Sequence, residues 1–185
     1  LPKGSIYDWG CSTGALIGAL RTQNNKRNYI GLDYSDPMIK QAQLKSFNTN
    51  FDCQFQVGDI THLNPLQDAA CIVCNLVLQF TPINMRSKII EHLFNQLKPG
   101  GILVIVEKIK QSDPELQAAY NHQFYQYKKH HGYSQVEVER KEASLTDVLW
   151  PETSAYYLEQ LSVLKPKVLD IFFKWYNFTG IIAKK

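Results

Sequence analysis

The chain has 185 residues, of which 44% are hydrophobic and 20% charged, as expected for one globular domain with a real core. Its formal net charge of +3 is too small to argue for nucleic-acid binding, and no apolar run approaches the length of about 18 residues that suggests a membrane span. No signal peptide is visible. The first predicted strand follows Leu1 almost at once, so we expect that an N-terminal segment of the whole protein is missing here.

Residues 4–14 predict a strand, a tight glycine turn and the start of a helix. A short apolar run ends at Gly10, and an apolar helical pattern begins after Gly14. Glycine accepts positive φ and lets a ligand approach the backbone. The free N–H groups at the start of the following helix favour an anionic or polar group. This turn is therefore a candidate ligand site.

A second apolar run, Tyr29–Leu32, ends in Asp33, nineteen residues after Gly14. An acid at the end of the second strand is placed to accept hydrogen bonds from a ribose diol. The glycine turn and this acid together predict a cofactor that contains adenosine.

The next part of the chain alternates helices and strands. The predicted ranges are 37–47 (helix, capped by Ser35 or Asp36), 53–57 (strand), 70–77 (strand), 83–97 (helix, ended by Lys98-Pro-Gly-Gly) and 102–106 (strand). The nearly continuous apolar run at 70–77 is typical of a central parallel strand, which is covered on both faces. This alternation predicts an α/β fold with a parallel sheet, right-handed crossovers and helices on both faces.

From Ser112 onward the pattern changes. Helices are predicted at 113–131, 134–149 and 151–161, followed by strands at 168–176 and 178–183. These two strands are so close in sequence that they must form an antiparallel hairpin, which we expect at the sheet edge. We expect one domain over 1–185, with a helical insertion at about 112–163 that forms a substrate-specific wall.

Cysteine and histidine do not predict a metal site. Cys71 and Cys74 have metal or redox spacing, but residues three apart on a strand point to opposite faces, so we expect buried thiols and a reducing cytoplasm. His130 and His131 are adjacent on a predicted helix and do not share a face. We do not expect Cys11, in the glycine turn, to act as a nucleophile.

Two acids have two readings each. Asp8 either satisfies N–H groups of the glycine turn or binds a cofactor amine, and the sequence favours neither reading. Asp59 either accepts a hydrogen bond from an adenine amine, with Ile60 against the ring, or caps a helix with Thr61. The preceding ribose signal favours the adenine reading of Asp59.

The predicted strands at 70–77 and 102–106 both lead to polar residues at the edge where ligands of open α/β sheets bind. Asn75 interrupts the first run, and a buried amide needs partners, so it is a local bond-maker or, as we favour, a ligand contact. Glu107 and Lys108 follow the second strand in the same crevice. Their alternative is a surface ion pair, which is worth little.

The glycine turn, Asp33, Gly58-Asp59 and Lys98-Pro-Gly-Gly together resemble class I S-adenosylmethionine-dependent methyltransferases. The fold implied is a Rossmann-like sheet of seven strands with the last antiparallel. A narrower resemblance, to the carboxy-S-adenosylmethionine synthase family, formerly called a tRNA (uridine-5-oxyacetic acid) methyltransferase, covers nearly the whole chain. Its motifs lie at 7–15, 75–80, 97–101, 107–108, 132–134, 149–153 and 176–178.

This resemblance implies that the carboxyl group of prephenate moves to the methyl carbon of S-adenosylmethionine, with release of phenylpyruvate. The product then serves a partner enzyme that carboxymethylates a wobble uridine of tRNA. The resemblance also implies a homodimer, and we expect no direct contact with nucleic acid or membrane. A sulfonium methyl group can lose a proton and act as a carbon nucleophile, provided that the site excludes water.

Carried over by position, the resemblance implies cofactor contacts but identifies no catalytic residue. The implied cofactor-binding set is Gly10, Cys11, Ser12, Asp33, Tyr34, Asp59, Ile60 and Asn75. The family's cofactor-contacting tyrosine, which lies before the first strand, is absent from this chain.

The chain departs from the family at the carboxylate-binding position. Three residues before Leu145, where the family has an arginine, this chain has Glu142. A guanidinium fork binds a carboxylate and a glutamate repels it, although Arg140 and Lys141 lie close in sequence. The main alternative is therefore an ordinary methyltransferase on the same frame, and the third is a non-catalytic cofactor-binding partner.

Overall fold

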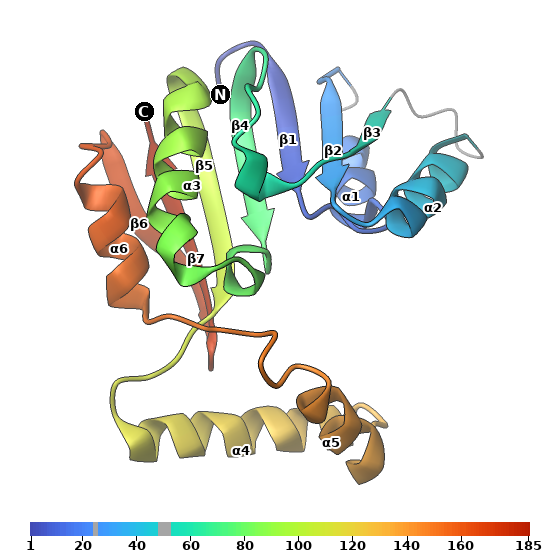
Figure 1. The fold of residues 1–185 in the computed structure, drawn as a ribbon, viewed down its shortest axis with the longest axis vertical. Coiled ribbons are helices and arrows are strands. Elements are labelled where there is room, and N and C mark those ends of the chain that lie inside the picture. Colours follow the sequence, from blue (N-terminus) through green and yellow to red (C-terminus); the bar gives the residue numbers. More distant parts are fainter. Residues whose placement is uncertain (24–25, 48–52) are drawn as a thin grey trace.

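The computed structural model describes residues 1–23, 26–47 and 53–185, which form one seven-stranded sheet with helices on both faces (Figure 1). The strand order is β3-β2-β1-β4-β5-β7-β6, and β7 runs antiparallel to both of its neighbours. The α/β fold, the parallel order of the first five strands and the antiparallel hairpin at the edge are all confirmed.

The strands are β1 (Ser5–Trp9), β2 (Tyr29–Asp33), β3 (Cys53–Val57), β4 (Ala69–Asn75), β5 (Leu97–Lys108), β6 (Val168–Trp175) and β7 (Phe178–Lys184). The helices are α1 (Ala15–Gln23), α2 (Asp36–Phe47), α3 (Ile83–Gln96), α4 (Pro114–His130), α5 (Gln135–Ala143) and α6 (Ser154–Ser162). Two short 3-10 helices, η1 (Ile60–His62) and η2 (Leu78–Phe80), follow β3 and β4. None of the described helices is both long and apolar enough to cross a membrane.

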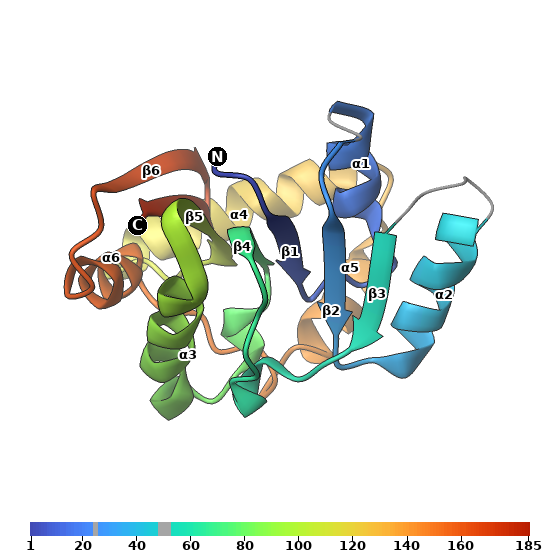
Figure 2. The ribbon, with the colours of Figure 1, turned by 90° about the horizontal axis from the view of Figure 1, so that it is seen from above.

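Two hydrophobic clusters hold the helices to the sheet, because strand side chains alternate between the faces. One cluster joins β1, β4 and β5 to α3 and α6, and the other joins β1, β2 and β4 to α1 and α2. Figure 2 shows α1 and α3 on opposite faces. Cys74 belongs to the first cluster and Cys71 to the second, which confirms their predicted burial on opposite faces.

Three predicted boundaries were wrong. Strand β5 starts at Leu97 rather than at 102. The Lys98-Pro-Gly-Gly segment ends α3, but it stays within the strand as a bulge between the paired residues Ala69–Leu97 and Cys71–Ile102. Gly100 has a φ of 80° in this bulge, which favours glycine. Helix α5 ends at Ala143, well before 149. Helix α6 starts at Ser154 rather than 151, because the Thr153 hydroxyl accepts a 3.1 Å bond from the Tyr156 N–H.

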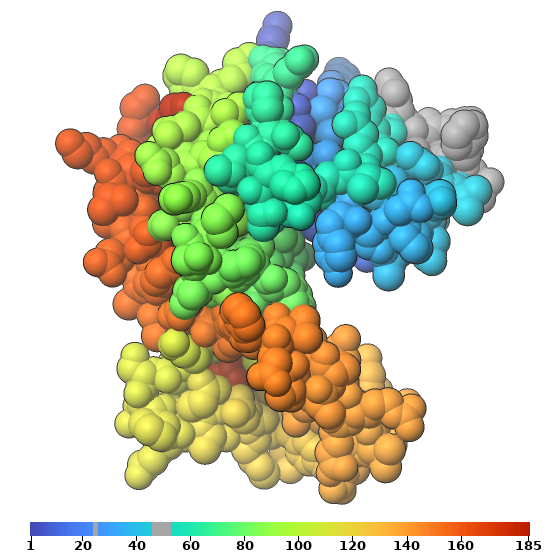
Figure 3. Space-filling view, in the orientation of Figure 1, coloured from blue at the N-terminus to red at the C-terminus, as the bar shows by residue number. Residues whose placement is uncertain are grey.

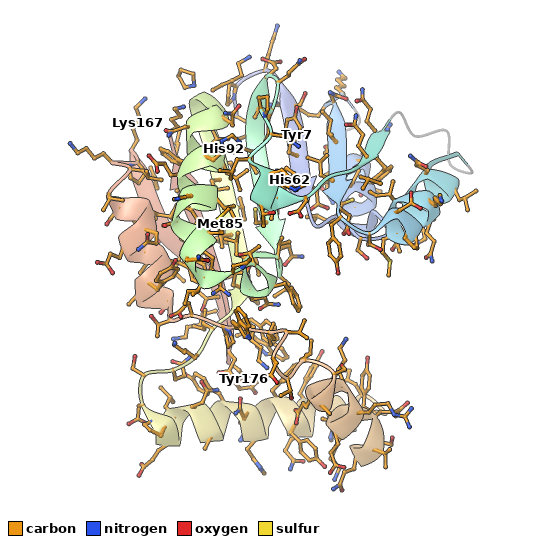
Figure 4. The ribbon with its side chains drawn as sticks, in the orientation of Figure 1. Tyr7, His62, Met85, His92, Lys167 and Tyr176 are labelled. Carbon is orange, nitrogen blue, oxygen red and sulfur yellow. The ribbon has the colours of Figure 1, made fainter. Side chains whose placement is uncertain are left out.

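The segment between β5 and α6 forms a lobe beneath the edge where the parallel strands end (Figures 1 and 3). No α4 side chain is buried. The helix is held by aromatic contacts to the β6–β7 hairpin, such as Phe124 to Phe178, with ring centroids 5.3 Å apart. Tyr176, at the hairpin turn, faces α4 (Figure 4) and lies 6.0 Å from the Tyr120 ring.

Candidate cofactor and substrate site

The glycine turn closes on the end of β2. The Gly10 and Cys11 N–H groups both donate to the Leu32 carbonyl, at 2.7 and 3.0 Å, and the Gly14 N–H donates to the Cys11 carbonyl at 2.8 Å. Gly10 has a φ of 72°, and a Cβ there would lie 2.3 Å from Cγ2 of Val77. Only glycine allows the turn to pass this closely under the segment that follows β4.

Asp33 connects the turn to β2. Its Oδ2 accepts a 2.8 Å hydrogen bond from the Ser12 N–H, and its Oδ1 accepts a 2.9 Å bond from the Ser35 N–H. Each carboxylate oxygen has further lone-pair capacity, so the arrangement still permits bonds from ribose hydroxyls. Tyr34, the next residue, is 80% exposed on the outer side of this loop.

Asp8 lies behind the turn and is 2% exposed. The turn N–H groups go to the Leu32 and Cys11 carbonyls and to Asp33, so they do not need Asp8. Burial, and then the charge of Asp33, raise the pKa of Asp8 from 3.8 to about 7. This weakens the turn-holding reading of Asp8, and its contact with a cofactor amine stays a prediction.

Cys11 is a buried, protonated thiol. Burial first, and then the charges of Asp8 and Asp33, raise its pKa to about 12. The thiolate is the nucleophilic form of cysteine, so this residue is a small filler of the turn and not a reactive group.

Asp59 caps η1. Its Oδ1 accepts bonds from the Thr61 N–H at 2.8 Å and from the Thr61 hydroxyl at 2.7 Å. Burial raises the pKa of Asp59, but these two bonds and the charge of His62 together outweigh burial, so the net pKa is below its ordinary value. The helix-cap reading is thus realised, with Ile60 buried beside it. The adenine contact of Asp59 and Ile60 stays a prediction.

Asn75 is exposed, so the expectation of a buried amide was wrong. The apolar part of β4 ends at Cys74, and the chain turns away at Leu76, whose φ is 60° and whose N–H donates to the Val106 carbonyl at 2.7 Å. Asn75 therefore needs no protein partner to satisfy it. Its ligand contact stays a prediction, at the same sheet edge as Gly10 and Asp33.

Glu107 is not part of a surface ion pair; it is 1% exposed. Its carboxylate accepts bonds from the N–H groups of Val77 at 2.9 Å, Leu78 at 2.7 Å and Gln79 at 3.1 Å. Burial raises the pKa of Glu107 to about 7, although these bonds oppose the shift. Glu107 follows Leu103 and Ile105 on the buried face of β5, and this alternation was the signal that sequence reasoning missed.

Arg86 of α3 holds the other end of the same short helix and is 0% exposed. Its Nε and Nη2 donate to the Thr81 carbonyl at 3.2 and 3.0 Å, and Nη2 also donates to the Gln79 carbonyl at 3.3 Å. The Glu107 carboxylate binds N–H groups at the start of η2, and the Arg86 guanidinium binds carbonyl groups at its end. These two side chains therefore fix η2 beside the glycine turn. No sequence motif had indicated Arg86.

A cavity of about 600 Å³ lies between α4 and α5. Arg140 and Lys141 line it, as does Lys128, whose Nζ lies 3.5 Å from Oε1 of Glu142. Glu142, at the position where the resemblance implies an arginine, pairs instead with this lysine. Among the described residues, no group of three or more His, Cys, Asp or Glu side chains could hold a metal ion.

Residues 6–101 match the family model described as a methyltransferase domain. Two solved structures show the same fold. PigF with SAH has a TM-score of 0.71 at 14% identity, covering 98% of this chain and 50% of that chain. Human N-acetylserotonin methyltransferase (ASMT) in complex with SAM has a TM-score of 0.66 at 19% identity, covering 98% and 47%. This chain spans about half the length of each. Fold and turn together define a class I methyltransferase-type domain.

Two curated proteins named carboxy-S-adenosyl-L-methionine synthase are similar over the whole chain. The protein from Hydrogenovibrio crunogenus is 35% identical over 100% of this chain and 74% of its own length. The one from Wolinella succinogenes is 34% identical over 100% and 78%. The chain belongs to the carboxy-S-adenosyl-L-methionine synthase family, and it is a transferase of the S-adenosylmethionine-dependent class.

Proposed function

We propose that this protein binds S-adenosylmethionine at the glycine turn and transfers the carboxyl group of prephenate to the cofactor's methyl carbon. The reaction balances when the ring hydroxyl of prephenate leaves with the methyl proton as water, and phenylpyruvate is the other product. The observation that carries the proposal is the extent of the likeness to the synthases. It covers 100% of the chain, and so it includes the α4–α5 lobe, which lies outside the general methyltransferase match at 6–101. The lobe is where a substrate-specific wall belongs.

The proposed cofactor contacts follow the edge of the sheet. The backbone of Gly10, Cys11 and Ser12 cradles the methionine end, and the Asp8 carboxylate receives its amine. Asp33 accepts bonds from the ribose, while Tyr34 lies beside it. Asp59 and Ile60 hold the adenine, and Asn75 closes the edge opposite the turn. When bound, the cofactor supplies a sulfonium methyl group that can lose a proton and act as a carbon nucleophile.

The fit rests on features of this chain. Gly10 lets the turn pass close to Val77, and the N–H groups of residues 10–12 and 14 are satisfied without Asp8. Asp8 is therefore a buried carboxylate beside the turn, and we assign it the amine of the cofactor. Asp33 retains acceptor capacity after its two backbone bonds. The residues present therefore suit a ligand with a cationic amine at one end and a diol farther along.

Glu142 supports the second candidate, an ordinary methyltransferase on the same frame. A carboxylate at this position opposes a substrate carboxylate, whereas a neutral methyl acceptor does not need the arginine. A non-catalytic cofactor-binding role is the third possibility, and methyl transfer to any acceptor would exclude it.

We also propose a cytoplasmic homodimer whose product is consumed by a partner enzyme acting on a wobble uridine of tRNA. The four cysteines are free thiols, which suits a reducing compartment. The net charge of +3 gives no reason to expect direct tRNA binding. Light scattering coupled to gel filtration of the full-length protein tests the dimer, and a measured mass equal to that of one full-length chain would contradict it.

The test of the proposed reaction is an incubation of the full-length protein with S-adenosylmethionine and prephenate. Mass spectrometry should find a cofactor heavier by one carbon dioxide unit, and phenylpyruvate should accumulate in equal amount. A bound cofactor of unchanged mass would exclude carboxyl transfer and favour the methyltransferase candidate. Glu142→Arg is the matched gain-of-function variant and should raise the yield.

A further inference from the structure

The cavity between α4 and α5 combines aromatic walls with an excess of positive charge. Phe124, Tyr127 and Tyr133 contribute rings, while Lys128, Arg140 and Lys141 contribute cations. Glu137, the acid of the lining, is engaged elsewhere, because its Oε2 accepts bonds from the Ser134 N–H at 2.8 Å and hydroxyl at 2.7 Å. A volume of about 600 Å³ suits a small organic ligand.

Lys128 contacts both an aromatic ring and a carboxylate in this cavity. Its side chain is 17% exposed, and its Nζ lies 4.4 Å above the centre of the Phe124 ring. Its carboxylate partner, Glu142, is 60% exposed at a distance of 3.5 Å. An ion pair with so exposed a partner is weak, so another carboxylate can replace it.

Arg140 and Lys141 of α5 bring further positive charge to the lining of the same cavity. Because like charges repel, a second anion is favoured beside these cations.

We propose that Lys128 forms the subsite for the carboxylate of an aromatic or cyclic carboxylate ligand, and that Glu142 is an internal carboxylate which this ligand displaces. This inference rests on the proposed function, because it assigns the carboxylate substrate a place in the lobe. Glu142 then does not exclude a carboxylate from the site; it competes with it.

The test is calorimetric titration of the cofactor-free, full-length protein with phenylpyruvate as the probe. Glu142→Gln removes the competitor and should bind the probe about threefold tighter, as expected for a partly exposed ion pair. Lys128→Met should bind it about tenfold more weakly, a loss typical of a charge-assisted hydrogen bond. Lys129→Met is the matched control, since Lys129 lies over the Tyr125 ring and does not line the cavity.

The double variant Glu142→Gln/Lys128→Met separates displacement from a general structural effect. Without Lys128, Glu142 has no ammonium group for which it competes with the ligand, so Glu142→Gln should no longer tighten the binding of phenylpyruvate. The inference is overturned if Lys128→Met binds like the wild type, if Glu142→Gln binds no tighter, or if neither wild type nor Glu142→Gln binds the probe.

A parallel titration with S-adenosylhomocysteine distinguishes this subsite from the proposed function. If that ligand binds all variants equally but the phenylpyruvate pattern fails, the subsite alone is wrong. If it does not bind at all while the phenylpyruvate pattern holds, the proposed function fails and the carboxylate subsite stands.

Discussion

The Ser12 backbone N–H donates a 2.8 Å hydrogen bond to the carboxylate of Asp33, and this bond joins the glycine turn to the end of the second strand. The other Asp33 oxygen takes the Ser35 N–H at 2.9 Å. One side chain therefore fixes two backbone segments on either side of the proposed ribose position. Asp33 therefore shapes the site, and its contact with the ribose is what we propose.

Asp33→Asn should weaken S-adenosylhomocysteine binding by at least about tenfold and lower the free energy of unfolding by about 1–3 kcal/mol. An amide has one acceptor oxygen, so the Ser12 or the Ser35 N–H must face an NH₂ group. Calorimetry and urea unfolding measure the two effects. Asp36→Asn is the control, because Asp36 forms only an exposed pair with Lys40 at 2.6 Å. Equal affinity in both variants would contradict the role of Asp33.

Gly10→Ala should abolish cofactor binding and destabilise the fold, because its methyl group would lie 2.3 Å from Cγ2 of Val77 and the φ of 72° strains any L-residue. Adding Val77→Ala removes that atom and should restore part of the stability, leaving the φ strain.

Gly18→Ala is the opposite control for Gly10→Ala. Apart from its chain neighbours and the backbone of its own helix α1, no described atom lies within 4 Å of the new methyl group, so the substitution should stabilise by about 0.5–1 kcal/mol. Thermal unfolding decides, and a harmless Gly10→Ala would refute the close approach.

Asp8 should make stability and cofactor affinity respond to pH in opposite directions. Its pKa rises from 3.8 to about 7 on folding, so its contribution to stability is full below pH 3.8 and is lost as pH rises toward 7. Asp8→Asn should therefore be up to about 4 kcal/mol more stable than the wild type at pH 8 and equal to it near pH 3.5.

The same substitution should weaken S-adenosylmethionine binding about tenfold at pH 8, because an ionised Asp8 is needed to pair with the cofactor amine. Wild-type affinity should increase from pH 6 to pH 8, and the Asp8→Asn profile should be flat. If the two profiles run parallel, Asp8 does not contact the amine.

Glu107→Gln should lower the free energy of unfolding by about 1–3 kcal/mol. Glutamine cannot accept all three bonds from Val77, Leu78 and Gln79 in this buried position, and its NH₂ group faces a donor. Glu91→Gln, at an exposed position of α3, should change stability by less than about 0.5 kcal/mol. Urea unfolding measures the free energy of unfolding of both variants, and similar losses would show that Glu107 does not anchor η2.

Much of the fold could be predicted because its signals are local. The glycine turn, the apolar run of β4 and the short final hairpin each define an element and its neighbours. The start of β5 at Leu97 could not be found, since Lys98-Pro-Gly-Gly has the composition of a loop and pairs only because β4 offers a partner for a bulge. Tertiary pairing overrides local propensity at such positions.

The sequence predicts Asp33 at the end of the second strand, and the structure confirms that position, beside the glycine turn. Glu107 and Arg86 could not be recognised from the sequence. The backbone partners of Glu107 lie up to thirty residues away in sequence, those of Arg86 lie up to seven residues away, and only the fold shows that these groups are buried together. The predicted burial of Asn75 was wrong because the chain turns outward at Leu76. Leu76 has a positive φ, which a leucine in the sequence does not predict.

The most direct test of carboxyl transfer uses prephenate labelled with carbon-13 in its ring carboxyl group, incubated with the full-length protein and S-adenosylmethionine. The label should appear in a cofactor that is heavier by one labelled carbon dioxide unit, with unlabelled phenylpyruvate released in equal amount. Recovery of the cofactor at its original mass, although calorimetry shows that it binds, would contradict the account.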